Sequence, residues 1–215
     1  MTGGRADFTL HPSIFVIAFL SLPSAGPYGH TVKQYSPSGA LLKTLGTPGI
    51  AGSRLSPLQF DQPADIFIKG EDEVYIVDGD GGMNNRLLKL TDDFSLQWTL
   101  GGNGTKPGQF YIPHSVVVDD VGRRRTKKTQ QVAFFLRLIF VKKRRTRRKT
   151  QRFCVRFSIW VADRGNKRIQ VFDTVGGEWI GSWDSCFSED GPYSVRYIHK
   201  LYTQFIAQRP ILASI

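Results

Sequence analysis

The sequence predicts an all-β protein built from a repeated four-stranded unit, and three observations support this. Short apolar or alternating segments are separated by turns rich in Gly, Pro, Asn and Asp. The pattern Phe-x-x-Pro before a strand begins at Phe60 and again 50 residues later at Phe110. A strand that ends in Asp recurs at Asp78 and Asp163. Four-stranded units that recur about every 40–50 residues are typical of the blades of a β-propeller.

Before the first full repeat, the chain has two different parts. Residues 1–27 contain an apolar run at residues 13–22, and we expect this part to be either a signal peptide or a disordered end. The run is too short to span a bilayer as a helix, so we expect no transmembrane segment. Between residues 29 and 46, two strands flank a turn at residues 36–39, and they correspond to the last two strands of a blade.

The first full repeat covers residues 60–101 and the second begins at Phe110. Alternating apolar positions and the turns between them predict four strands in the first repeat. We expect these strands at residues 60–68, 73–78, 85–90 and 95–101. The second repeat continues at residues 159–173. Asp78 and Asp163 are 85 residues apart, 35 more than the period of 50, and we attribute the excess to an insertion in the second repeat.

The distribution of charge sets this insertion apart from the repeats. The net charge is +11, but residues 123–156 hold 15 of the 29 Lys and Arg and no Asp or Glu. The remainder carries 14 basic residues against 18 acidic ones and is therefore mildly acidic. We define residues 124–158 as a basic insertion within a blade, and any hypothesis of nucleic-acid binding depends on it alone. Cys154 and Cys186 show neither a disulfide framework nor the spacing of a metal site.

Three short motifs in the repeats resemble those of the NHL-repeat proteins. They are Phe-x-x-Pro before the first strand, Val-x-Asp or Val-Ala-Asp at the end of the second, and Asn-Arg or Asn-Lys-Arg before an aliphatic residue. They occur at Phe60/Pro63 and Phe110/Pro113, at Val77/Asp78 and Val161-Ala162-Asp163, and at Asn85-Arg86-Leu87 and Asn166-Lys167-Arg168-Ile169. The resemblance covers residues 28–123 and 159–196.

The resemblance implies a closed propeller of about six blades, of which this chain contains a part. Residues 28–196 hold the last two strands of one blade, two full blades and, at residues 193–196, the start of another. The tail, residues 197–215, matches no blade. Because a propeller avoids free sheet edges by closing into a ring, an incomplete ring exposes apolar blade faces. We therefore expect the chain alone to be marginally stable.

His114 is the first candidate site residue, because it follows Pro113 at the start of a blade strand. In the amidating lyases that cleave peptidyl-hydroxyglycine, which resemble this family, Pro-His at this position supplies a zinc ligand. The resemblance therefore implies that His114 binds zinc in a complete propeller, but these repeats supply no further histidine at a matching position. The alternative is a histidine that lines the central channel.

Three arginines and one carboxylate complete the candidate set. Arg164 matches a lyase arginine that contacts substrate, and a guanidinium forms bidentate pairs with carboxylates; the alternative is a surface arginine. Asp80 occupies a turn in which the lyases carry a tyrosine that serves as base, so we assign no catalytic residue. Arg86 and Arg168 lie at equivalent positions of two blades, and this repetition favours a structural role, such as bonding to backbone or to an acidic side chain.

Asn103 begins Asn-Gly-Thr, an acceptor for N-glycosylation in a loop between blades. Glycosylation requires passage through the secretory pathway, and the resemblance favours that pathway or the extracellular space. Apart from zinc in a complete propeller, no cofactor is expected.

The main functional hypothesis is a non-catalytic, secreted scaffold of NHL repeats that binds a protein or peptide. Three alternatives differ from it in class. The first is an enzyme, a zinc-dependent peptidyl-hydroxyglycine amidating lyase that cleaves a carbon–nitrogen bond. The second is nucleic-acid binding through residues 124–158, which we do not expect. The third is association with a ubiquitin ligase, which would need a partner because the sequence has no RING-type Cys/His spacing.

Overall fold

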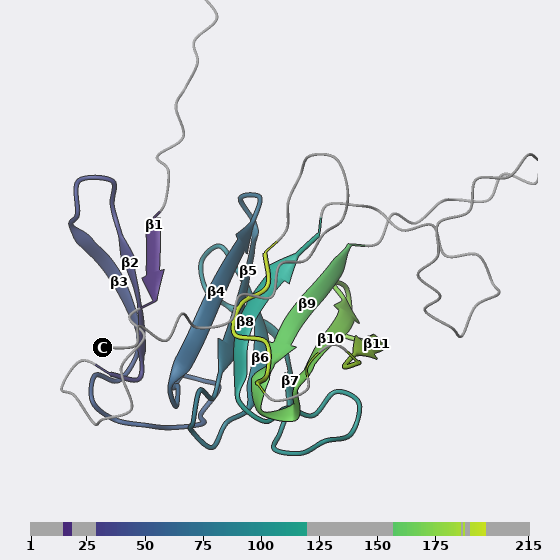
Figure 1. Cartoon of the computed structure of the whole chain (residues 1–215). Coiled ribbons are helices and arrows are strands. Elements are labelled where there is room, and N and C mark those ends of the chain that lie inside the picture. The colour runs from purple at the N-terminus through teal and green to yellow at the C-terminus, as the bar shows by residue number, and fades with distance from the viewer. Residues whose placement is uncertain (1–14, 19–28, 120–156, 186, 188–189, 197–215) are drawn as a thin grey trace, which may run out of the picture.

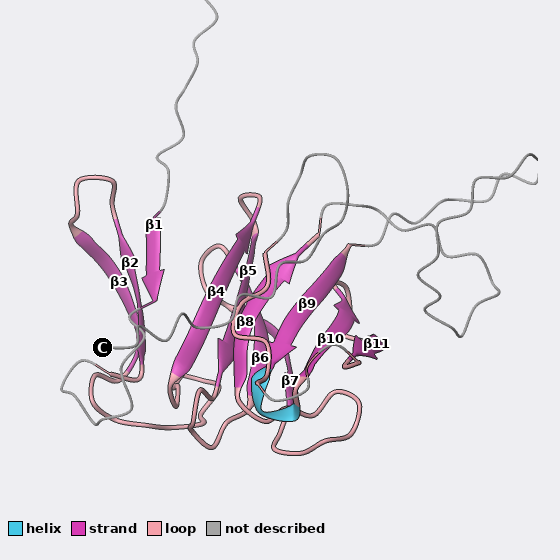
Figure 2. Cartoon of the chain, in the orientation of Figure 1, coloured by secondary structure: helices cyan, strands magenta, loops and turns pink. Residues whose placement is uncertain are grey.

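The computed structural model describes residues 15–18, 29–119, 157–185, 187 and 190–196. This part of the chain forms three antiparallel β-sheets, arranged side by side in chain order (Figures 1 and 2). One short 3₁₀ helix, η1 (Arg164–Asn166), follows the second strand of the third sheet. The prediction of an incomplete all-β propeller is confirmed by this architecture.

Each sheet follows the order expected of a blade. The first sheet contains β1 (Phe15–Ala18), β2 (Thr31–Tyr35) and β3 (Leu41–Gly46). The second contains β4 (Pro63–Lys69), β5 (Glu73–Asp78), β6 (Arg86–Thr91) and β7 (Leu96–Gly101). The third contains β8 (Pro113–Val118), β9 (Ser158–Asp163), β10 (Arg168–Asp173) and β11 (Trp179–Trp183). Consecutive strands pair in the order β4-β5-β6-β7 and β8-β9-β10-β11.

The first strand of each full repeat begins at its proline, three residues later than the sequence pattern suggested. Gln62 and Ile112, which precede these prolines, have positive φ values of 63° and 59°. A left-handed residue interrupts the extended backbone, so the strand starts only after it. The aromatic side chains at Phe60 and Phe110 are instead fully buried between sheets.

The sheets pack face to face through two apolar clusters. The middle strands of the second sheet, β5 and β6, are mostly buried on both faces because this sheet lies between the other two. The cluster between the first and second sheets contains Val32, Phe60, Val74, Ile76, Leu88, Leu90 and Phe94. The cluster between the second and third sheets contains Ala64, Tyr75, Val77, Leu87, Phe110, Val116, Val118, Ile159, Val161 and Phe172. Burial of these faces is the main force that holds consecutive repeats together.

The far face of the third sheet is less open than the sequence suggested. Val117, Trp160 and Val171 on this face are 3%, 6% and 8% exposed. Val195 packs in the same cluster and Phe187 lies against it. The expectation of an exposed apolar face is therefore wrong here, because the chain after β11 returns over the sheet.

Residues 193–196 were expected to start another blade, and they form no strand. Their position nevertheless repeats that of β8. The backbone N–H of Val195 donates to the Ser115 hydroxyl at 3.2 Å, just as the N–H of Val116 donates to the Asp65 carboxylate at 3.1 Å. Pro192 therefore corresponds to Pro113, and the segment lies where the first strand of a following blade belongs.

The first sheet differs from the prediction by one strand. The sequence assigned two strands to it, whereas β1 pairs with β2 and makes a third. β1 lies inside the region for which we expected a signal peptide or disorder. Most of the basic insertion, residues 124–156, and the tail, residues 197–215, lie outside the described residues. Among the helices of the described part, none is long and apolar enough to cross a membrane.

Candidate functional site

The inner edges of the sheets bring four polar or aromatic side chains to one place. β4 and β8 are edge strands that lie against each other, while β7 and β11 form the opposite edges. His114 stands at the start of β8 and Arg164 directly follows β9. Asp80 follows β5, and Tyr193 comes from the returning segment. We call these four residues the inner-edge cluster.

Asp80 lies between the His114 imidazole and the Arg164 guanidinium. Its carboxylate oxygens are 3.6 Å from Nε2 of His114 and 3.6 Å from Nη1 of Arg164. Both distances exceed those of a hydrogen bond, so both contacts are loose, and the one to Arg164 is a loose ion pair. The three side chains are 21–32% exposed. The cluster therefore offers donors and an acceptor to a molecule that approaches from solvent.

Tyr193 organises the cluster through four contacts. Its backbone carbonyl lies 2.7 Å from Nδ1 of His114, and the two rings meet edge to face with centroids 5.2 Å apart. The guanidinium of Arg164 stacks over the Tyr193 ring at 3.9 Å and also donates to its hydroxyl. The stacking attracts the cation to the ring face. Tyr193 thus fixes the orientation of the His114 and Arg164 side chains.

A second polar group lies along the same inner edges. The Ser115 hydroxyl donates to the Asp65 carboxylate at 2.7 Å. Nη1 of Arg196 is 3.4 Å from the Ser115 hydroxyl and 3.9 Å from the Asp65 carboxylate. These bonds tie three consecutive repeat positions together, and Arg196 remains largely exposed.

The structure brings some of the predicted site residues together and leaves others apart. His114 and Arg164, predicted separately, meet in the inner-edge cluster through Asp80 and Tyr193. Tyr193 was not predicted as a site residue, although Pro192-Tyr193 repeats the pattern of Pro113-His114 in the sequence. Asn103 lies exposed in the loop between β7 and β8, apart from the cluster. Zinc binding by His114 stays a prediction; the described residues contain no group of three His, Cys, Asp or Glu that could hold a metal ion.

Arg86 and Arg168 have the structural role that their repetition suggested. Nε of each donates to a buried carboxylate: Arg86 to Asp78 at 3.0 Å and Arg168 to Asp163 at 2.8 Å. Their remaining donors bind backbone carbonyls of the loop that precedes each blade: Ser53 and Gln59 for Arg86, and Thr105, Lys106 and Gln109 for Arg168. We call these two groups the arginine clasps.

The two clasp carboxylates are embedded in equivalent networks. Each also accepts a backbone N–H two residues before the proline, from Asp61 or Tyr111, at 2.8 Å. Each accepts an amide donor as well, from Asn84 at 2.8 Å or Asn166 at 2.9 Å. Burial raises the pKa of both carboxyls, and the arginine and amide donors offset part of that rise. Asn84 and Asn166 each stand two residues before the clasp arginine and bind the same carboxylate. This shared partner explains the Asn-x-Arg spacing.

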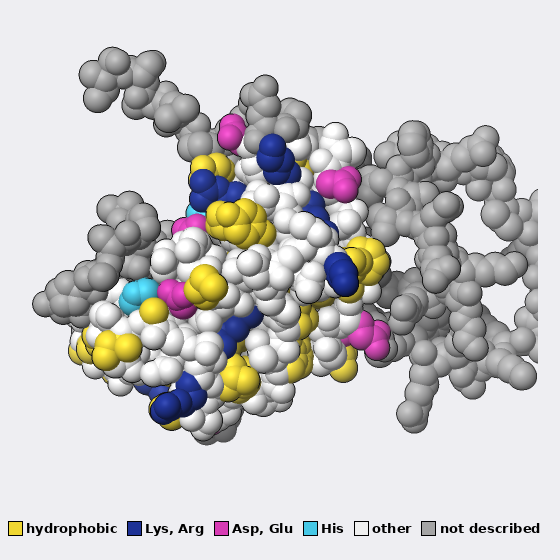
Figure 3. Space-filling view, turned by 90° about the horizontal axis from the view of Figure 1, so that it is seen from below, with side chains coloured by type: hydrophobic (Ala, Val, Ile, Leu, Met, Phe, Trp, Pro, Cys, Tyr) yellow, Lys and Arg dark blue, Asp and Glu magenta, His cyan; other side chains and the backbone are white. Residues whose placement is uncertain are grey.

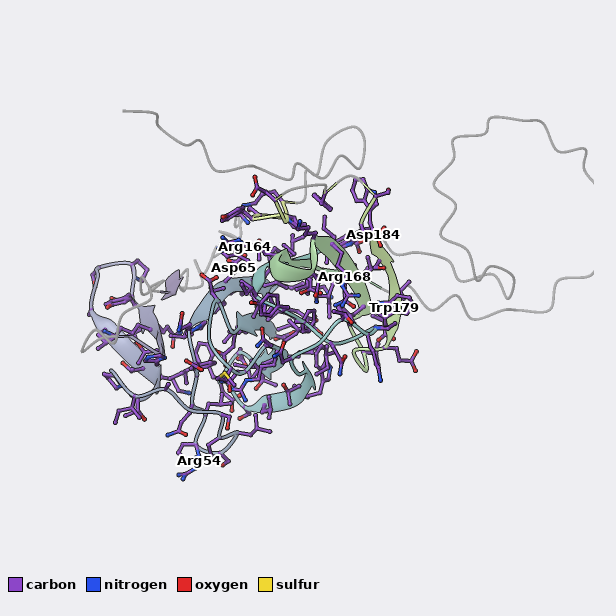
Figure 4. The ribbon with its side chains drawn as sticks, turned by 60° about the horizontal axis from the view of Figure 1, so that its bottom comes forward. Arg54, Asp65, Arg164, Arg168, Trp179 and Asp184 are labelled. Carbon is purple, nitrogen blue, oxygen red and sulfur yellow. The ribbon has the colours of Figure 1, made fainter. Side chains whose placement is uncertain are left out.

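Charges outside the cluster are dispersed. On the face shown in Figure 3, Lys, Arg, Asp and Glu side chains of the described residues are scattered among neutral surface and do not form one basic area. In Figure 4, Arg54 lies at the opposite side of the view from Arg164. The described surface in these views therefore offers no broad phosphate-binding patch of the kind that nucleic acids require.

Comparison with known proteins agrees with the motif resemblance. No family model matches the chain. Over 173 residues, 80% of the chain, it is 49% identical to NHL repeat-containing protein 3 of Mus musculus and 47% identical to NHL repeat-containing protein 3 of Homo sapiens. The chain spans about 40% of the length of these relatives. The similarity confirms that its repeats are of the NHL type and that they form a repeat scaffold.

Proposed function

We propose that this scaffold of NHL repeats, similar to part of NHL repeat-containing protein 3, is non-catalytic and binds a peptide or protein at the inner-edge cluster. The observation that carries the proposal is the placement of Arg164 over Tyr193 with its Nη1 only loosely paired to Asp80. An arginine held in orientation but not fully hydrogen-bonded is prepared to bind another acceptor.

The mixture of groups favours a peptide over a simple anion. An anion would gain from Arg164 and from protonated His114, but the Asp80 carboxylate between them opposes it. A peptide carries both carbonyl or carboxylate oxygens and N–H groups. Its oxygens can accept from Arg164 while an N–H donates to Asp80, so that both charges are satisfied.

The absence of an assigned catalytic pair also favours binding. Asp80 is more than hydrogen-bond distance from His114, and its carboxylate also faces the guanidinium of Arg164. Such a group offers recognition and no nucleophile. The lyase alternative, which depends on zinc at His114, stays a prediction and is addressed by metal analysis below.

A peptide array tests the proposal. Two matched sets of short synthetic peptides are compared, one with free C-terminal carboxylates and one amidated. We expect the full chain to retain carboxylate-bearing peptides, R164A to lose about tenfold or more in affinity, and R54A, which changes an exposed arginine away from the cluster, to bind normally. Equal binding by wild type and R164A would refute the assignment of Arg164.

Passage through the secretory pathway is the second part of the proposal. It is supported by the position of Asn103, exposed in a loop where a glycan can be accommodated without disturbing a sheet. Expression in secreting animal cells, followed by glycosidase treatment, should reduce the apparent mass of the wild type and leave that of N103Q unchanged. A wild-type protein insensitive to the glycosidase would contradict this part.

A further inference from the structure

β1 occupies the position of the second strand of a blade. In the full sheets, the second strand pairs with the third: Val77 faces Leu87, and Ala162 faces Ile169. Leu87 and Ile169 are the second residues of β6 and β10. In the first sheet, the second residue of the corresponding strand β2 is Val32, and it faces Ala18 of β1.

The register is the same along the whole of β1. Each of its four residues faces one residue of β2, with Phe15 opposite Tyr35, Val16 opposite Gln34 and Ile17 opposite Lys33. Phe-Val-Ile-Ala therefore takes the place of Val-Tyr-Ile-Val at residues 74–77 and of Ile-Trp-Val-Ala at residues 159–162. All three quartets are apolar throughout, and the two in the full sheets are buried.

The edge of β2 needs such a cover. β3 occupies one side of β2, and β1 the other. Without β1, the ladder of backbone N–H and C=O groups on that side would be open, next to the buried residues Thr31 and Val32. An open edge of this kind is a template for pairing with another strand.

We propose that the edge of β2 is an acceptor site for an extended apolar strand, and that residues 15–18 are its occupant within the chain. Recognition comes from main-chain hydrogen bonds to β2 and from alternate apolar side chains, the mode known as strand addition. A strand from another molecule with an apolar quartet of the blade type competes for the same edge. Residues 15–18 thus control access to the site.

Disulfide cross-linking tests the occupancy in the full chain, with Cys154 and Cys186 changed to Ser. V16C/Q34C joins a register pair, whereas I17C/Q34C joins residues one position out of register. Opposite residues of an antiparallel pair have Cβ atoms about 4.5–5.5 Å apart, within reach of a disulfide after small shifts. We expect V16C/Q34C to lose both free thiols on mild oxidation and I17C/Q34C to keep them. Equal oxidation of the two variants would overturn the register.

The same variant tests the acceptor site with a defined probe. The probe is a labelled peptide with the sequence of residues 73–78, Glu-Val-Tyr-Ile-Val-Asp, and its control is the scrambled sequence. Oxidised V16C/Q34C holds β1 in place, so we expect its affinity for the probe to be about tenfold or more below that of the reduced protein. Equal binding before and after reduction would refute the acceptor site, whatever the outcome for the inner-edge cluster.

Discussion

The arginine clasps and the inner-edge cluster use the same residue type in opposite ways. Arg86 and Arg168 recur at equivalent positions, have side chains only 9% and 12% exposed, and direct their donors to a buried carboxylate and to backbone carbonyls. Arg164 has no counterpart in the second sheet, where Gly79 follows the strand, and its side chain is 31% exposed. Repetition, together with a hydrogen bond from every guanidinium nitrogen, marks a structural residue, whereas a single loosely paired arginine is available for recognition.

The largest effect is expected when a clasp is broken. R168A removes the ion-pair partner of the buried Asp163 carboxylate and the guanidinium donors to three loop carbonyls. Loss of one partner of a buried ion pair costs about 3–5 kcal/mol in the free energy of unfolding. Chemical denaturation followed by tryptophan fluorescence would measure it. R54A serves as the control, and a loss no larger than that of R54A would break the comparison.

Substitution at the inner-edge cluster should give the reverse result. R164A removes a partly exposed guanidinium whose ion pair to Asp80 is 3.6 Å long, so we expect it to change the free energy of unfolding by less than about 1 kcal/mol. Peptide binding should nevertheless fall, as described above. A destabilisation equal to that of R168A would show that Arg164 is a structural residue as well.

The contrast between these arginines also explains what the sequence could predict. The strands and the clasps follow from Phe-x-x-Pro, the terminal Asp and Asn-x-Arg, because each motif makes local bonds that recur with the period. The inner-edge cluster depends on Tyr193, whose equivalence to His114 is obscured by the insertion and by the lack of Phe before Pro192. β1 was missed because no Asp follows its apolar quartet.

An intermediate case is expected at Glu73, a carboxylate on β5 that is less buried than Asp78. Burial alone would raise its pKa, but hydrogen bonds from Lys89, Lys69 and Tyr75 outweigh this and place the pKa below its ordinary value of 4.5. The ionised form thus stabilises the folded state above pH 4.5, and this contribution is lost as the pH falls through the folded pKa. Relative to wild type, E73Q should show a weaker loss of stability in that range. Parallel pH profiles of the two proteins would contradict this.

The smallest effect is expected for substitution of His114, although the sequence made its most specific chemical prediction there, a zinc ligand. In this chain His114 directs Nδ1 to the Tyr193 carbonyl and Nε2 towards Asp80, an arrangement that gives a zinc ion at most two ligands among the cluster residues. Catalytic zinc sites use three protein ligands and leave one position open. Elemental analysis of the purified full chain should therefore find no stoichiometric zinc, both in wild type and in H114A. One zinc per chain that disappears in H114A would instead favour the lyase alternative, because it would require ligands from parts of the chain outside the cluster.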